Sequence, residues 1–226
     1  MWTKLKLRPD LLLLLSLLLA IVLTPVLDRD GWRRFVLAGV TFIPVILSTV
    51  RLSQIRMWAW PSIVLMLVNV AFVIAGNTFR SQVLSGLRWV FLAAFFALTA
   101  VGLFSNLRRS RIVTESHLYT AVSIYLLLGL LWTSLYLAIE SFYPGSIQMP
   151  NHPGERDAEL LYFSLITLST VGYGDILPLS GEARIAAALE GVTGVLYIAI
   201  TVALLVGRFK VETSDPPDPE GMTGEK

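Results

Sequence analysis

Six residues in the C-terminal part of the chain, 170–175, read TVGYGD and place two glycines between apolar stretches. Gly172 and Gly174 permit positive φ at alternating positions. A strand that alternates between left- and right-handed conformations can point successive carbonyl groups to one side, and the Thr170 hydroxyl extends that row. Because rings of such oxygens can replace the hydration shell of a dehydrated cation, the chemistry that this run predicts is cation coordination.

The segment before this run predicts a short helix that enters a membrane and turns back. Asp157 and Glu159 suit the first turn of a helix, where negative charge meets the positive end of the helix dipole. About three turns of mostly apolar sequence follow, too few to cross a bilayer. Irregular backbone at membrane depth is tolerated only inside protein or along a water-filled cavity. We therefore expect residues 170–175 to line a pore, with the helix aiming its negative end at the inner cavity.

The composition is that of an integral membrane protein. Of the 226 residues, 55% are hydrophobic and only 15% are charged, which is too little charge to cover the surface of a soluble domain of this length. The net charge of +2 gives no support for a nucleic-acid partner, so membrane lipids are the expected surroundings. The absence of cysteine excludes disulfides and thiolate metal sites.

Six apolar stretches are long enough, or nearly so, to cross a bilayer with some tilting. They cover about residues 10–27, 34–50, 57–76, 88–106, 117–141 and 183–208. The first four connections are short, whereas a long connection separates the last two stretches and contains the predicted re-entrant helix. The fold class that follows is an all-α membrane protein of six transmembrane helices, with a re-entrant helix and loop between the fifth and sixth.

The distribution of basic residues predicts the orientation of the chain. Lys4, Lys6 and Arg8 precede an apolar core as in a signal peptide, but no small-x-small cleavage pattern follows, so we expect a retained first span. Lys and Arg are more numerous on the side that holds this N-terminus, which places both termini in the cytoplasm of a multi-pass cell-membrane protein. Residues 211–226 are rich in proline and charge and predict a disordered cytoplasmic tail.

The run from Thr170 to Asp175 resembles the selectivity filter of the potassium channel family. The pattern of outer helix, pore helix, filter and inner helix, over about residues 112–210, is similar to that family's pore domain. The resemblance implies four identical subunits around one pore, K+ as the permeant ion and no cofactor. The residues that it implies as the filter are Thr170, Val171, Gly172, Tyr173 and Gly174, with K+ held at the first four.

Several residues around the filter are expected to support it. Many members of the family brace the filter tyrosine with two pore-helix tryptophans, but this chain has Tyr162 and Phe163 there. Some members also pair the aspartate after the filter with a pore-helix glutamate, whereas Ile166 stands at that position, so Asp175 lacks this partner. The support residues assigned from the sequence are Asp175, Tyr162, Phe163, Thr167 and Ser169.

Three residues of the last span are candidates for a hinge or gate. Gly191 and Gly194 fall where the family has its inner-helix hinge glycine, with Gly194 the better match, and close helix packing is the alternative. Glu190 is an intramembrane carboxylate and hence a functional candidate. It either braces the base of the pore helix, through Thr167 or Ser169, or faces the ion path.

The resulting domain prediction has four parts: a four-helix membrane bundle over 1–106, a linker over 107–116, a pore domain over 117–210 and the tail over 211–226. The fourth span carries no charge between Arg88 and Arg108, so the bundle lacks the gating charges of a voltage sensor.

The predicted function is a K+-selective channel that conducts passively, with weak or no voltage dependence. The alternative is a subunit of a potassium-uptake transporter related to channel pores, although such systems carry four repeats and degraded filters. An enzyme is not expected, because no span pairs a nucleophile with a histidine or carboxylate at helical spacing.

Overall fold

The computed structural model describes residues 9–27, 56–79, 81–109, 114–150 and 156–207. This part of the chain is mostly helical, with one short strand pair. Its elements are α1 (Pro9–Leu27), α3 (Arg56–Phe79), α4 (Gln82–Arg109), α5 (Glu115–Phe142), β1 (Ile147–Gln148), α6 (Arg156–Leu168), β2 (Leu177–Pro178) and α7 (Gly181–Val206).

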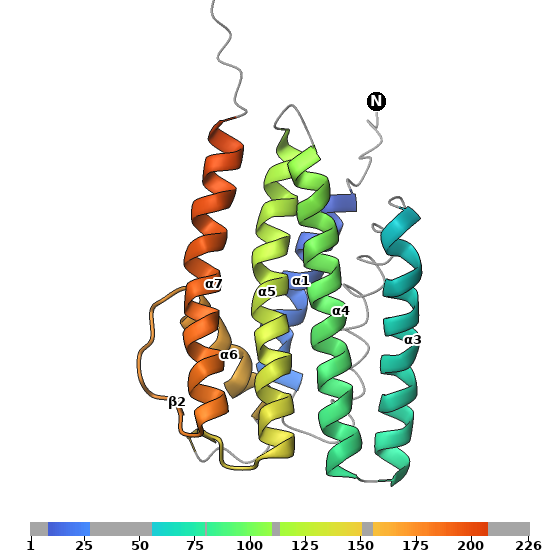
Figure 1. The fold of residues 1–226 in the computed structure, drawn as a ribbon, viewed down its shortest axis with the longest axis vertical. Coiled ribbons are helices and arrows are strands. Elements are labelled where there is room, and N and C mark those ends of the chain that lie inside the picture. Colours follow the sequence, from blue (N-terminus) through green and yellow to red (C-terminus); the bar gives the residue numbers. More distant parts are fainter. Residues whose placement is uncertain (1–8, 28–55, 80, 110–113, 151–155, 208–226) are drawn as a thin grey trace, which may run out of the picture.

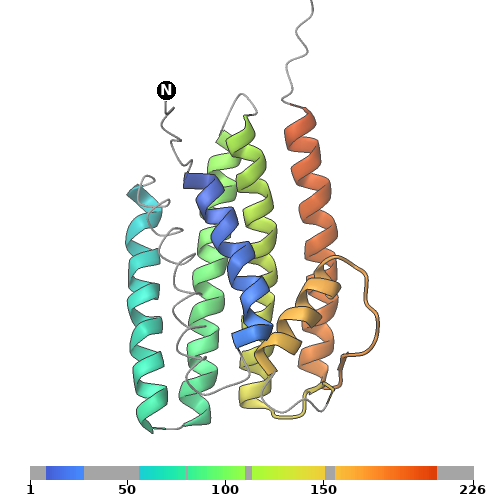
Figure 2. The same ribbon diagram turned by 180° about the vertical axis from the view of Figure 1, so that it is seen from behind.

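The long helices stand side by side as a bundle (Figure 1). Helix α5 lies between α4 and α7, and α1 packs against it from behind, as the reverse view shows (Figure 2). The start of α1, the end of α4 and the end of α7 lie at one end of the bundle. The short α6 begins at the opposite end and stops about halfway, beside α7. The order of the chain thus brings a re-entrant helix and its following loop alongside the last long helix.

Most of the predicted spans coincide with observed helices. Helices α1, α3, α4, α5 and α7 cover five of the six apolar stretches, and α6 covers the predicted re-entrant helix. The predicted second span, 34–50, and the predicted tail, 211–226, lie outside the described residues. Residues 107–109 of the predicted linker are helical instead, because the buried Leu107 keeps the last turn of α4 packed and two arginines there suit the dipole.

Three of the described helices, α4, α5 and α7, are long and apolar enough to cross a membrane. Helices α1 and α3 contain shorter apolar stretches, Pro9–Pro25 and Trp60–Phe72. Together with α6, which is too short to cross, these features define a multi-pass membrane protein with an inserted half-helix.

Helix α5 is shared by two apolar clusters. The first joins it to α1 and α4, through buried side chains such as Leu17, Phe95 and Leu127. The second joins it to α6 and α7, through side chains such as Tyr136, Phe163 and Leu168. Helices α1 and α4 are therefore packed directly on the same helix that holds the re-entrant segment.

A short antiparallel strand pair departs from the all-α prediction. Strand β1 follows α5 and pairs with β2 just before α7, with Ile147 opposite Pro178 and Gln148 opposite Leu177. The pairing ties the start of the long connection to its end. Two-residue strands carry no period-2 signal, so the sequence does not predict them.

Candidate functional site

The chain reverses immediately after α6 because one carbonyl of that helix accepts two amides of the following loop. The backbone N–H groups of Val171 and Gly172 both donate to the carbonyl oxygen of Ile166, at 2.9 and 3.2 Å. Thr170 donates its amide to Thr167 at 3.0 Å. The first residues of the TVGYGD run are thus fixed to the last turn of α6.

The run alternates in backbone handedness. Thr170, Gly172 and Gly174 have positive φ angles of 60°, 52° and 78°, whereas the residues between them do not. This alternation is the backbone pattern that lets successive carbonyls point to one side, as a cation-coordinating row requires. The positive φ at both glycines agrees with the sequence-based expectation, and the same conformation at the β-branched Thr170 is an additional, strained feature.

The run is accessible in the single chain. Val171 is 52% exposed and Tyr173 is 73% exposed. A Cβ built on Gly172 or Gly174 would meet no atom within 4 Å. One side of the run is therefore free to face an ion or another copy of the chain.

Tyr162 holds the residue that follows the run. Its hydroxyl donates to the Asp175 carboxylate at 2.8 Å, so Asp175 has a pore-helix partner even though Ile166 offers none. This hydrogen bond, with a smaller contribution from burial, raises the pKa of Tyr162 to about 12. The phenol therefore remains a neutral donor throughout the physiological pH range.

The other assigned support residues occupy different surroundings. Phe163 is buried and packs on Tyr136, with 4.9 Å between the ring centroids, so it braces α6 against α5 rather than the loop. Ser169 is exposed and donates its hydroxyl to Leu165 at 2.7 Å. Thr167 contributes its carbonyl to the turn described above.

Helix α7 crosses the end of α6 at two glycines. A Cβ on Gly194 would overlap the carbonyl oxygen of Leu168 and lie 2.9 Å from its carbonyl carbon. At Gly191 the nearest atom, the Thr167 carbonyl oxygen, would be 4.0 Å away. Only a glycine fits at position 194 in this arrangement, which gives that residue a packing role whether or not it also bends.

Glu190 lies on the same face of α7 and is fully buried, with an exposed fraction of 0%. Its carboxyl group accepts a hydrogen bond from Tyr136 of α5 at 2.5 Å and lies 2.6 Å from the hydroxyl of Ser164 of α6. The partners expected from the sequence, Thr167 and Ser169, are wrong, because α7 meets α6 about one turn nearer its start. This geometry favours the bracing hypothesis over a carboxylate that faces the ion path.

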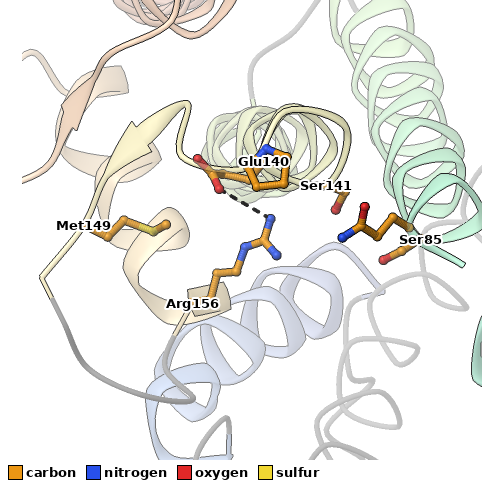
Figure 3. A pocket seen from close by; sticks show the side chains of 7 residues that line it. Ser85, Glu140, Ser141, Met149 and Arg156 are labelled. Carbon is orange, nitrogen blue, oxygen red and sulfur yellow. Dashed lines mark ion pairs between the residues drawn. The ribbon is translucent and has the colours of Figure 1, made fainter. Parts of the chain in front are cut away.

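A second buried carboxylate, Glu140, anchors the connection after α5. It accepts the amides of Ile147 at 2.7 Å and Gly145 at 3.2 Å. The Arg156 guanidinium, at the first residue of α6, lies 3.9 Å from it, at the edge of a hollow of about 310 Å³ (Figure 3). One side chain thus connects the end of α5 to both β1 and the start of α6.

The sequence-based assignment missed Tyr136, Ser164 and Glu140. Each is a polar residue in, or at the end of, an apolar helix, and that is the signal that identifies such positions as candidates. Their partners lie between 5 and 54 residues away in the chain, so the contacts themselves have no local signature.

Comparison with known proteins agrees with this geometry. Residues 156–210 match the family described as Ion channel. The potassium voltage-gated channel protein shk-1 of Caenorhabditis elegans is 32% identical over 85 residues, which is 38% of this chain and 16% of that protein. The inward rectifier potassium channel Kirbac3.1 of Paramagnetospirillum magnetotacticum is 30% identical over 95 residues, 40% of this chain and 29% of that protein.

A putative potassium channel protein of Rhodopseudomonas palustris, RPA4233, is 33% identical over 51 residues, 23% of this chain and 12% of that protein. The chain thus spans less than a third of the length of each of these relatives. No solved structure gives a significant match.

A half-helix, a loop of alternating handedness and a long helix packed against the half-helix are the parts of an ion channel domain. The family match covers these parts, and the relatives are named as potassium channels. The segment that contains α6, the TVGYGD run and α7 is therefore similar in sequence to the Ion channel family and to potassium channels.

Proposed function

We propose that this chain is one subunit of a K+-selective channel that conducts passively across the cell membrane. The observation that carries the proposal is the alternation of positive φ at Thr170, Gly172 and Gly174 directly after a helix too short to cross. In this proposal the carbonyls of Thr170, Val171, Gly172 and Tyr173 take the place of the K+ hydration shell, and Gly174 completes the filter.

The proposed assembly is a homotetramer of six-span subunits with both termini in the cytoplasm. Support for association comes from α7, whose apolar side chains are mostly exposed in the single chain, among them Ile185, Val192 and Val195. The filter also leaves one side open, and a single copy cannot enclose an ion. Four copies would surround it with four sets of carbonyls.

The proposed channel has weak or no voltage dependence and no enzymatic activity. Helix α4 carries arginines near its two ends, Arg88, Arg108 and Arg109, and apolar residues between them. Moving a charge through the membrane field is worth about 2.3 kcal/mol per 100 mV, and this helix has no charge placed to supply that energy. The transporter alternative has no comparable observation in its favour.

Potassium flux in proteoliposomes tests the proposal. We expect a radiotracer K+ flux that rises with K+ concentration without carrier-like saturation. Ba2+, which is similar to K+ in size but doubly charged, should block it. Gly172→Ala should abolish it, because the filter needs φ of +52° there. Gly145→Ala is the matched control, since Gly145 has φ of +84° in the connection after α5. A K+ flux that saturates like that of a carrier, or an equal loss of flux in both variants, would contradict the proposed channel function.

A further inference from the structure

Three fully buried polar side chains from three different helices meet behind the filter. Tyr136 of α5 donates its hydroxyl to Oε2 of Glu190 on α7, and Ser164 of α6 lies 2.6 Å from Oε1 of the same carboxyl group. All three side chains have an exposed fraction of 0%. This Tyr136–Glu190–Ser164 cluster is the place where the outer, inner and re-entrant helices share one set of hydrogen bonds.

The number of hydrogens in the cluster determines the protonation state of Glu190. The Ser164 oxygen is 2.8 Å from the carbonyl oxygen of Gly129 and 2.6 Å from Glu190 Oε1, yet its hydroxyl has one hydrogen. Without a second hydrogen, the one hydroxyl hydrogen would have to be shared between two acceptor oxygens, which is weaker than two separate hydrogen bonds at these short distances. A proton on Oε1 supplies it: Glu190 donates to Ser164, and Ser164 donates to Gly129.

The charges around the cluster agree with a neutral acid. The titratable groups that face Glu190 from α5 are Tyr136 and Tyr125, and α6 faces it with the neutral Ser164. The hydrogen-bond partners of this fully buried carboxyl are thus both neutral hydroxyls. An ionised carboxylate without a cation is strongly disfavoured in such surroundings.

A second contact between α6 and α7 lies one helical turn beyond the cluster. Gly194 follows Glu190 by four residues and packs on Leu168, which follows Ser164 by four residues. Residues four apart lie on one face of a helix, so α6 and α7 touch at two successive turns. A displacement of α7 must therefore move the end of α6, to which the filter is fixed through Ile166.

We propose that Glu190 is held as the neutral carboxylic acid and that Tyr136, Glu190 and Ser164 are positioning residues for the filter. They hold α6 between α5 and α7, so the position of the inner helix sets the geometry at which the filter begins. The filter-positioning part rests on the proposed channel function, whereas the protonation of Glu190 does not.

Infrared difference spectroscopy of the whole protein in lipid tests the protonation directly. Subtracting the spectrum of Glu190→Gln from that of the natural sequence should leave the carbonyl stretch of a protonated carboxylic acid at neutral pH. Glu140→Gln is the matched control, since Glu140 is a buried carboxylate that accepts backbone amides, and it should leave a carboxylate band instead. A carboxylate band in the Glu190 difference would overturn the neutral-acid assignment, whether or not the protein conducts.

Single-channel recording tests the positioning role. Glu190→Gln keeps a donor and an acceptor, so we expect nearly natural open times, whereas Glu190→Leu should shorten them strongly. Tyr136→Phe removes one hydrogen bond and should shorten open times about 2- to 10-fold with unchanged unitary conductance. Tyr143→Phe, at an exposed tyrosine after α5, should change nothing.

The outcomes separate the two proposals. Equal damage from Glu190→Gln and Glu190→Leu, or natural open times in Tyr136→Phe, would overturn the positioning role. If the natural sequence shows no K+ selectivity, the proposed function is overturned, and the spectroscopic result on Glu190 is unaffected.

Discussion

Thr170 is the residue at which the backbone carries strain. Among the described residues it is the only non-glycine with positive φ, and a β-branched side chain at φ of 60° costs on the order of 1–3 kcal/mol. Two amides on the Ile166 carbonyl and one on Thr167 hold the turn that imposes this conformation. The strained residue thus lies at the junction of α6 and the filter. Hydrogen bonds to the last turn of α6 hold its conformation.

Tyr162→Phe tests the support of the outer end of the filter. The substitution keeps the ring and removes the hydrogen bond to Asp175, so we expect faster loss of current during sustained opening with little change in assembly. Asp175→Ala should have a similar effect, and the double variant should add little, because both changes remove the same interaction. Strictly additive effects in such a double-mutant cycle would show that the two residues act separately.

The same hydrogen bond predicts how the channel responds to alkaline solutions. The pKa of Tyr162 is raised to about 12, so the neutral donor persists below the ordinary tyrosine pKa of about 10 and is lost only as pH rises through 12. Between about pH 7 and pH 10, the natural sequence should not show the faster loss of current that is expected of Tyr162→Phe. A transition to that behaviour within this range, absent in Tyr162→Phe itself, would contradict the assignment.

Gly194→Ala tests the close contact between α6 and α7. The added methyl group would overlap the Leu168 carbonyl, so we expect a loss of about 1–3 kcal/mol in the unfolding free energy of the assembled protein. Gly191→Ala is the matched control on the same helix, because its nearest neighbour is 4.0 Å away. Thermal melts in detergent compare the two. If Gly194→Ala is as stable as the natural sequence but its gating is altered, Gly194 acts as a hinge and not through close packing.

At the scale of elements, the length of α6 decides its role. Its 13 residues extend about 20 Å, against a hydrocarbon core of about 30 Å, so the helix must end inside the membrane. Its ends are held differently: the buried Glu140 lies beside Arg156 at the start, while Glu190 and Gly194 contact its last two turns. The half-helix therefore contacts α5 at its start and both α5 and α7 in its last two turns.

Glu140→Gln should loosen the connection after α5 without unfolding the helices. An amide side chain has one oxygen where the carboxylate uses two, so the amides of Gly145 and Ile147 cannot both be satisfied. Hydrogen exchange at these two amides should become faster, with the helices of the pore segment unaffected. Glu182→Gln, at an exposed glutamate in the first turn of α7, serves as the control. Unchanged exchange at Ile147 would contradict the anchoring role.

The elements differ in how well the sequence predicts them. The long apolar helices, α6 and the glycine-dependent turn are local patterns, and in the described part of the chain their predicted positions agree with the structure. The β1–β2 pair and the partners of Glu190 are not local: Tyr136 is 54 residues from Glu190 and Ser164 is 26 residues from it. Which turn of α7 meets which turn of α6 depends on packing, and the sequence-based partners were displaced by about one turn for that reason.

At the scale of the whole molecule, the N-terminal helices are attached to the pore segment within one chain. Helices α1 and α4 both pack on α5, and Tyr197 of α7 reaches Ala121 of α5 at 2.5 Å while its ring lies 6.5 Å from that of Phe104 on α4. Contacts of this kind give a stimulus acting on α4 a direct path to the inner helix. In the proposed function, α4 is nevertheless not a voltage sensor.

The open probability should therefore change little with voltage. The Arg88 guanidinium stacks on Trp89 at 4.0 Å near one end of α4, and Arg108 and Arg109 lie in its last turn, with no charge in between. Macroscopic conductance in planar bilayers, measured over a wide voltage range, should follow the driving force alone. A steep conductance–voltage curve, or a gating current recorded with K+ removed, would contradict this account of α4.

Selectivity is the central claim, and the reversal potential under bi-ionic conditions tests it most directly. Purified protein in a planar bilayer, with K+ on one side and Na+ on the other, should give currents that reverse far from zero, in the direction set by K+ permeation. The reason is the row of filter oxygens from Thr170 to Tyr173. A reversal potential at zero, which means equal permeation of the two ions, would contradict the account.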